Sequence, residues 1–123
     1  MNAIAIDSKH LIEEYFELLS GHAKTEELID RYVDDPALKE HILQCEAAFP
    51  KYELITDQFI AEGDTVAFRG KMRGTHNGSF AGVEATGRQV EADVMLFYRV
   101  EGAKIAKFWM VFDAASLMQQ LTA

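Results

Sequence analysis

The chain has 123 residues, 49% hydrophobic and 26% charged, a composition that lets a globular protein bury one core without disulfides or metals. Its formal net charge of −8 argues against nucleic acid and anionic membranes as partners, because phosphate groups are bound by clustered Lys and Arg. Cys45 is the single cysteine, which excludes an internal disulfide and a thiolate metal site. We therefore expect a single domain over residues 1–123.

Location and metal content follow from two further features. The stretch from Met1 to Asp7 is too short and too soon charged to be a signal peptide, and no run approaches the length of a membrane span. We therefore expect a cytoplasmic location and no membrane partner. No two histidines have the spacing of a helical metal site, so we expect no metal.

Three helical patterns occupy the first part of the chain. Ser8–Leu19 carries an apolar stripe, with its first residue as a candidate N-cap and a glycine shortly after its end. Thr25–Tyr32 predicts a second, short helix. Asp35-Pro36 opens a third, because proline suits the first helical position after a capping aspartate, and Pro50 ends it.

From Tyr52 onward the apolar residues recur at every second position, which indicates strands. Residues 52–61 and 65–73 predict one hairpin, residues 89–100 and 104–112 predict another, and residues 114–121 predict a closing helix. Helices followed by an antiparallel meander predict an α+β fold, with the helices packed on one face of a curved, mainly antiparallel sheet.

The second hairpin also predicts which side chains share a face. If Val100 and Ile105 flank the turn, one face is almost wholly apolar and should meet the helices. That face carries Val90, Ala92, Val94, Leu96, Tyr98, Ile105, Trp109, Val111 and Asp113. The opposite face carries five large apolar side chains: Met95, Phe97, Phe108, Met110 and Phe112. A patch that the helices cannot cover is typical of a protein interface, so we expect a homodimer through it.

Two residues are candidates for chemistry. His76 lies in the glycine-rich connection Gly74–Gly87, and it either orients a substrate carbonyl, pairs with Asp113, or holds the connection in shape. Asp113 ends the last strand and precedes a helix. It is either an acid/base catalyst whose pKa is raised by an apolar wall that includes Trp109, or the N-cap of that helix.

A set of short motifs extends from the end of the helical part to the C-terminus. It comprises Phe49-Pro50, Ile60–Val66, Gly74–His76, Ala85–Arg88, Tyr98-Arg99, Lys104-Ile105, Trp109, Asp113 and Gln119–Leu121. In order and spacing these motifs resemble the SnoaL-like polyketide cyclase (ester cyclase) family. The resemblance implies the cone-shaped NTF2-like fold and cofactor-free chemistry. In such cyclases an aspartate is the acid/base of an intramolecular aldol closure, and Asp113 matches it by position.

The expected pocket combines both lines of reasoning. Its catalytic residues are Asp113 and His76, and its substrate-binding residues are Tyr15, Phe68, Leu96, Tyr98 and Trp109. The ligand is expected to be a small apolar or carbonyl-containing compound, with no cofactor. Two features depart from the family pattern. Many relatives carry a histidine where this chain has Phe108, and the compact region before Phe49 implies a smaller pocket.

Three functions are compatible with the sequence. The first is a cofactor-free enzyme that acts as a cyclase or isomerase, in the lyase or isomerase class. The second is a non-catalytic ligand-binding module. The third is a structural dimerising domain. Steroid isomerisation is excluded, because Leu96 and Phe97 stand where that chemistry needs a second acid. An epoxide hydrolase of this fold would need an Asp-Arg-Asp set, and Arg99 is expected on the face opposite Asp113.

Overall fold

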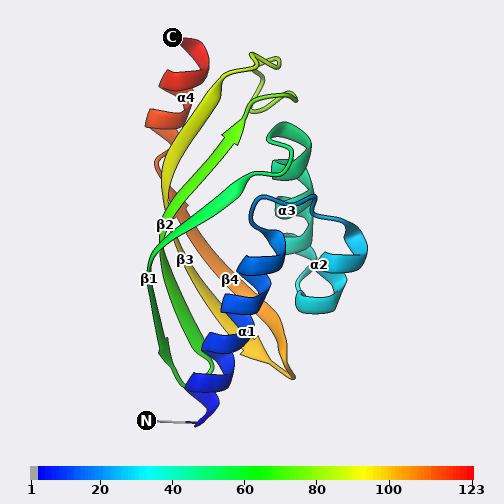
Figure 1. Ribbon diagram of the computed structural model, residues 1–123, viewed down its shortest axis with the longest axis vertical. Helices are drawn as coiled ribbons and strands as arrows, with labels where there is room; N and C mark the ends of the chain where they lie inside the picture. The colour runs from blue at the N-terminus through cyan, green and yellow to red at the C-terminus, as the bar shows by residue number, and fades with distance from the viewer. Residues whose placement is uncertain (1–2) are drawn as a thin grey trace.

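A computed structural model describes residues 3–123, with side chains described from residue 7 onward. Helices α1 (Ala3–Leu19), α2 (Glu26–Tyr32) and α3 (Pro36–Ala48) precede the strands β1 (Glu53–Glu62), β2 (Thr65–Thr75), β3 (Gln89–Glu101) and β4 (Lys104–Phe112), and α4 (Ala114–Thr122) follows them. The strands form one antiparallel sheet in the order β1-β2-β3-β4, and α1, α2 and α3 lie on one side of it (Figure 1). The predicted α+β class is confirmed.

Capping residues account for where two of the helices begin. The Thr25 side chain accepts a hydrogen bond from the Leu28 N–H at 3.2 Å, and Asp35 accepts one from the Ala37 N–H at 3.0 Å. The sequence predicted the Asp35 cap, whereas Thr25 was predicted as the first helical residue and is the cap that precedes it. The start predicted for α1 is wrong, because the helix begins at Ala3 and Ser8 lies within it. The apolar stripe continues to Ile4, seven residues before Leu11, so the interpretation of Ser8 as a cap placed the start too late.

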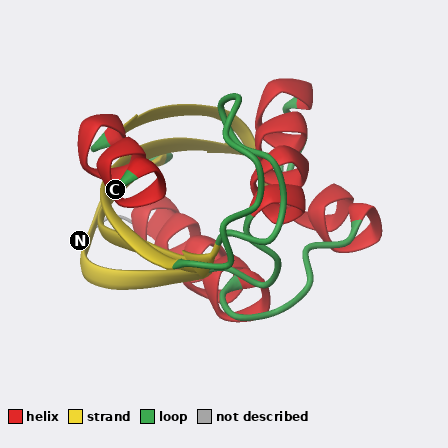
Figure 2. Cartoon of the chain, turned by 90° about the horizontal axis from the view of Figure 1, so that it is seen from above, coloured by secondary structure: helices red, strands yellow, loops and turns green. Residues whose placement is uncertain are grey.

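Helix α1 packs its aromatic face on the inner side of the sheet. The Phe16 ring lies 4.7 Å from that of Phe68 and 5.2 Å from that of Phe59, centroid to centroid, and the Tyr15 and Tyr98 rings are 6.2 Å apart. A second cluster joins the end of α3 to α4 and the neighbouring strands, and it includes Phe49, Val90, Leu117 and Leu121. The two clusters hold the helices against one concave face of the sheet (Figure 2).

The face prediction for β4 is wrong, because its register shifts by one residue. Val100 opposes Ile105 as predicted, but Arg99 opposes Lys107, which leaves Ala106 without a partner. An extra residue of this kind reverses which side of the sheet the following side chains face. Beyond it, three large side chains of β4 join the inner face: Phe108, Met110 and Phe112. Trp109 and Val111 lie on the outer face, where they are 49% and 73% exposed.

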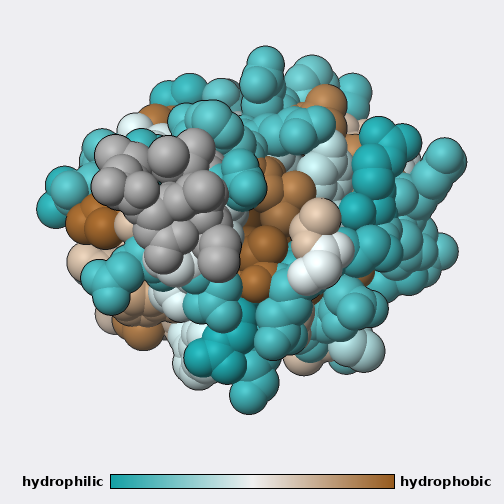
Figure 3. All heavy atoms as spheres, turned by 90° about the horizontal axis from the view of Figure 1, so that it is seen from below, coloured by the Kyte–Doolittle hydropathy of each residue, from teal (hydrophilic) through white to brown (hydrophobic). Residues whose placement is uncertain are grey.

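No helix in the described part of the chain is long and apolar enough to cross a membrane. Seen from below, the end of the molecule near the N-terminus is mostly hydrophilic, with hydrophobic groups in a small central hollow (Figure 3). A shallow depression at this end has Asp7, His10 and Glu14 among its lining residues. It shares no residue with the larger apolar cavity on the inner side of the sheet.

Gly70 allows β1 to fold closely over β2 at the irregularity between Thr56 and Gln58. A Cβ at Gly70 would lie 2.0 Å from the Ile55 carbonyl oxygen and 2.6 Å from the Phe68 ring. We predict that Gly70→Ala lowers the free energy of unfolding by at least ~2 kcal/mol, because the backbone must move. The control Gly63→Ala has open space and should lose about 1 kcal/mol, from its left-handed backbone alone. Equal losses in urea denaturation would contradict the close approach.

Candidate active site

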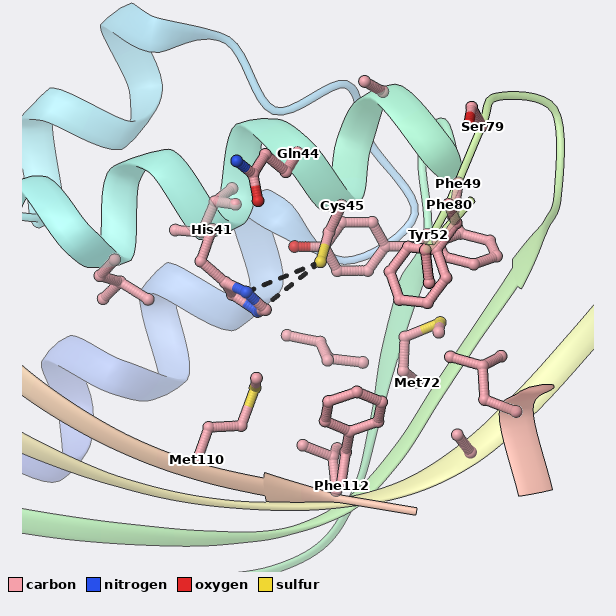
Figure 4. Close-up of a pocket in the computed structure, with 18 of the residues that line it drawn as sticks. His41, Gln44, Cys45, Phe49, Tyr52, Met72, Ser79, Phe80, Met110 and Phe112 are labelled. Atoms are coloured by element: carbon pink, nitrogen blue, oxygen red, sulfur yellow. Dashed lines mark hydrogen bonds between the residues drawn. The ribbon is translucent and has the colours of Figure 1, made fainter. Parts of the chain in front are cut away.

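A cavity of about 590 Å³ lies between α3 and the concave face of the sheet. Residues from α1, α3, α4, all four strands and the β2–β3 connection line it, so its shape depends on the whole fold. Its volume is in the range of small-molecule binding sites. Figure 4 shows side chains of α3 pointing across the cavity toward those of β4.

The lining carries no formal charge at neutral pH, because its one basic residue, His41, is neutral there. None of the described lining residues is Asp, Glu, Lys or Arg. Most of the wall is hydrophobic, with Phe49, Met72, Phe80, Phe112 and Leu117 among its members. Because a buried charge needs a partner of opposite sign, this lining suits an uncharged ligand.

The polar part of the wall begins with His41 and Cys45, one turn apart on α3. The Cys45 Sγ lies 3.6 Å from Nε2 and 3.9 Å from Nδ1 of the His41 ring (Figure 4). Burial lowers the pKa of His41 and raises the pKa of Cys45 to about 11. Both groups are therefore neutral at pH 7, so they form an imidazole beside a thiol and no thiolate–imidazolium pair.

Three tyrosines complete the polar part. Tyr15, Tyr52 and Tyr98 line the cavity and are at most 6% exposed. Within the described residues their hydroxyls have no hydrogen-bond partner, yet none of these oxygens is completely inaccessible to solvent. The Tyr52 hydroxyl points toward Cys45 (Figure 4). Burial raises the pKa of all three phenols well above its ordinary value, so they remain neutral donors.

Lys24 fixes Tyr52 from behind the cavity wall. Its ammonium donates to the Tyr52 carbonyl at 2.7 Å and to the His22 carbonyl at 2.8 Å, and it lies 4.0 Å from the centre of the Tyr52 ring. Burial lowers the pKa of Lys24 to about 8, although Glu46 at 3.6 Å opposes the change. The side chain thus joins the segment after α1 to the start of β1 and orients a cavity residue.

His76 is buried beside the cavity and does not line it. Its Nδ1 accepts a hydrogen bond from the Thr86 N–H at 3.2 Å and lies 3.0 Å from the Thr86 Oγ1, while its Nε2 is buried with no partner among the described residues. Its backbone bonds to Gly87 and Arg88 close the β2–β3 connection. These contacts match the prediction that His76 holds the connection in shape, and they bring Ser79–Ala81 to the cavity edge.

Asp113 lies outside the cavity, and its predicted position within it is wrong. The register shift in β4 leaves this aspartate exposed at the outer side of the sheet, beside Asp57 and Asp93 in a surface depression. Its carboxylate accepts a hydrogen bond from the Ser116 N–H at 3.0 Å, so it caps α4. The predicted pairing of Asp113 with His76 in the cavity does not occur, because neither residue lines the cavity.

The other predicted lining residues divide into three groups. Tyr15 and Tyr98 line the cavity, Leu96 and Phe68 are buried in the core beneath α1, and Trp109 is half exposed on the outer face. His41, Cys45 and Tyr52 were not predicted as site residues. One signal could have identified the first two, because positions 38, 41, 42 and 45 form one helical stripe. Within residues 3–123, no group of three or more His, Cys, Asp or Glu could hold a metal ion.

Comparisons with known proteins place the chain in a family. The family model described as SnoaL-like polyketide cyclase matches residues 13–121. Among solved structures, the chain is similar to AclR from Streptomyces galilaeus, with 23% identity, a TM-score of 0.81 and coverage of 95% of this chain and 82% of that one. It is also similar to a SnoaL-like polyketide cyclase from Agrobacterium tumefaciens, with 20% identity, a TM-score of 0.75 and coverage of 93% and 97%. These structures share the NTF2-like cone fold. A search of curated proteins found no match.

Substitutions at Asp113 test its capping role. Asp113→Ala is expected to lower the free energy of unfolding by roughly 0.5–2 kcal/mol, because the Ser116 N–H loses its acceptor. Asp113→Asn should be nearly neutral, since asparagine caps a helix about as well. Urea denaturation at pH 7 measures both changes. An Asn variant clearly more stable than the wild type would instead reveal a carboxylate that folding disfavours.

Lys24 makes stability depend on pH in a defined window. Its folded pKa of about 8 lies below the ordinary value, so between pH 8 and 10.5 the unfolded chain binds more protons and stability rises with pH. We expect the wild type to gain about 1–2 kcal/mol over Lys24→Met between pH 7.5 and 9.5. The control Lys39→Met removes a partly exposed, ion-paired lysine whose pKa is raised, and it should show no such difference from the wild type in this window. A parallel pH profile for Lys24→Met would show that the buried ammonium titrates normally.

Proposed function

Because this chain belongs to the SnoaL-like polyketide cyclase family, we propose that it is a cofactor-free enzyme that moves a proton on a small, uncharged carbonyl compound. A single observation carries the proposal. A neutral imidazole and unpartnered tyrosine hydroxyls line the same apolar, uncharged cavity. A base and hydrogen-bond donors of this kind are what enolisation of a carbonyl compound needs.

The cavity favours a neutral ligand with an apolar body and a polar end. Carboxylates, phosphates and amines would meet no residue of opposite charge on the described wall. The apolar side chains around Phe49, Phe80 and Phe112 suit a ring system, and the tyrosine hydroxyls suit a carbonyl oxygen as acceptor. The proposed ligand is therefore an uncharged ketone, aldehyde or ester that carries one or more rings.

His41 is the proposed base. Since burial lowers its pKa, the ring keeps a free nitrogen lone pair at pH 7 and can accept a proton from the carbon next to a carbonyl. The negative charge then develops on the carbonyl oxygen, where a hydroxyl of Tyr52 or Tyr98 donates a hydrogen bond. The imidazolium returns the proton to another carbon in an isomerisation, or to the alkoxide formed by an aldol closure.

The stacking of His41 on Phe108 supports this assignment. The two rings lie 6.0 Å apart, centroid to centroid, with an angle of 29° between their planes. This contact limits rotation of the imidazole, and the Cys45 thiol, 3.6 Å from Nε2, limits it further. A ring held in place and kept neutral is better prepared for proton transfer than a solvated histidine.

Hydrogen–deuterium exchange at the α-carbon of 1-tetralone, a neutral bicyclic ketone, tests the proposal. We expect the wild type to accelerate exchange in D2O, and His41→Phe to lose roughly 100-fold or more of the acceleration while it still binds the ketone. Tyr52→Phe should lose roughly 10- to 100-fold. The rate should be constant from pH 7 to 9 and fall in acid as His41 becomes protonated. NMR measures exchange and binding in the same samples.

Two controls decide between the alternatives. Asp113→Asn should exchange like the wild type, and 2-naphthoate, a bicyclic carboxylate, should not bind. A loss of exchange in Asp113→Asn with full activity in His41→Phe would make the aspartate the catalyst and overturn the proposal. Binding of 1-tetralone without any acceleration of exchange would instead identify a non-catalytic ligand-binding module.

A further inference from the structure

The cavity wall contains a nucleophile that takes no chemical part in the proposed proton transfer. Cys45 is the single cysteine of the chain, and its partly buried side chain lines the cavity from α3. Gln44 and Ala47, its exposed neighbours on the same helix, line the cavity too, so this part of the wall can be reached from solvent. The thiol therefore faces the space in which the ligand is expected to bind.

A base lies beside this thiol. The Cys45 Sγ is 3.6 Å from Nε2 and 3.9 Å from Nδ1 of His41, one helical turn earlier. Burial raises the pKa of Cys45 to about 11 and lowers that of His41, so at pH 7 the thiol keeps its proton and the ring can accept one. Such a thiol becomes a nucleophile when a neighbouring base takes its proton as the new bond to sulfur forms. The arrangement therefore favours an electrophile that is bound in the cavity beside both groups.

A hydrogen-bond donor without a partner points toward the same thiol. Tyr52 is 6% exposed, its hydroxyl points toward Cys45, and that hydroxyl has no partner among the described residues (Figure 4). A buried hydroxyl without an acceptor is unfavourable, and an oxygen atom of a ligand would supply the missing acceptor. A thiol, a base and a free donor thus surround one part of the cavity.

We propose that Cys45 forms a reversible covalent adduct with uncharged α,β-unsaturated ketones that bind in the cavity. The sulfur bonds to the β-carbon, the electron pair of the carbon–carbon double bond moves toward the carbonyl oxygen, and the S–H proton passes to His41. The Tyr52 hydroxyl donates a hydrogen bond to the enolate oxygen, which only three bonds separate from the β-carbon. His41 then returns the proton to the α-carbon. The product is a saturated thioether, and no oxidant or second reactant is consumed.

The adduct and the proposed enolisation are separate reactions in one cavity. Both use His41 as the base, but only the adduct needs the Cys45 thiol and a conjugated double bond in the ligand. 1-Tetralone has no such double bond outside its aromatic ring, so its hydrogen–deuterium exchange reports enolisation alone. Formation of the adduct is read as a gain in mass, which enolisation does not produce. The failure of one reaction can therefore be distinguished from the failure of the other.

Mass spectrometry of the intact protein with benzylideneacetone, an uncharged enone that carries one ring, tests the proposal. The wild type at pH 7 should gain the mass of one ketone molecule, and Cys45→Ser should gain none. Its rate constant should exceed that of the free thiol N-acetylcysteine by ~10-fold or more, although burial raises the pKa of Cys45. His41→Phe and Tyr52→Phe should each slow the reaction by ~10-fold or more.

Matched controls separate this site from ordinary thiol reactivity. His10→Phe removes an exposed histidine that does not line the cavity, and it should react like the wild type. Benzylacetone, the saturated analogue, should give no gain in mass. Circular dichroism confirms that each variant is folded, and the comparison with N-acetylcysteine needs no variant.

Three results would each overturn the proposal. They are a gain in mass that persists in Cys45→Ser, a wild-type rate no faster than that of N-acetylcysteine, and a full rate in a folded His41→Phe variant. An adduct with the expected dependence on His41, in a protein that does not exchange 1-tetralone, would support the covalent site and contradict the proposed enolisation alone.

Discussion

A single unpaired residue in β4, Ala106, determines which side chains reach the cavity and which reach the outer surface. Before it, Ile105 is fully buried, and its carbonyl accepts a hydrogen bond from the Asp34 N–H at 2.9 Å. After it, the register with β3 has moved by one residue. Because side chains alternate across a strand, this shift sends Met110 and Phe112 inward and Val111 outward. The cavity wall and the exposed apolar side chains of the outer face are therefore two consequences of one local irregularity.

The inward placement of Phe108, Met110 and Phe112 also sets the chemistry of the cavity. These side chains cover β4 with apolar surface and face the polar stripe of α3, so the ligand space has one polar and one apolar wall. Desolvation by this environment lowers the pKa of His41 and raises that of Tyr52. At pH 7 the cavity therefore holds a neutral imidazole that can accept a proton and neutral phenols that can donate hydrogen bonds to a developing enolate oxygen.

The sequence predicted the fold well, because the elements depend on local patterns. The strand periodicity, the capping residue Asp35 and the positions of the hairpin turns all agree with the structure. The face assignment failed in β4, where residues 105–112 are almost uniformly apolar and offer no alternation from which an extra residue could be detected. The error moved Trp109 and Asp113 into the expected site and left Met110 and Phe112 out of it.

The role of α3 was missed for a different physical reason. His41 shares a stripe with Leu38 and Ile42, but a histidine at a helix surface is also compatible with solvent exposure. Only the space between α3 and the sheet distinguishes the two cases, and that space depends on the lengths and curvature of elements far apart in the chain. Tyr52 was missed because it lies between elements, where its ring is placed by Lys24 and by the end of α3.

Methionine methyl groups offer the most direct test of the central claim, that β4 presents its even-numbered side chains to a ligand cavity. Met72 and Met110 line the cavity, whereas Met95 is 57% exposed on the outer face. With methionine methyls labelled by 13C, bound 1-tetralone should give nuclear Overhauser contacts to Met72 and Met110 and none to Met95. Contacts to Met95, with Met110 unaffected, would contradict the register and the cavity together.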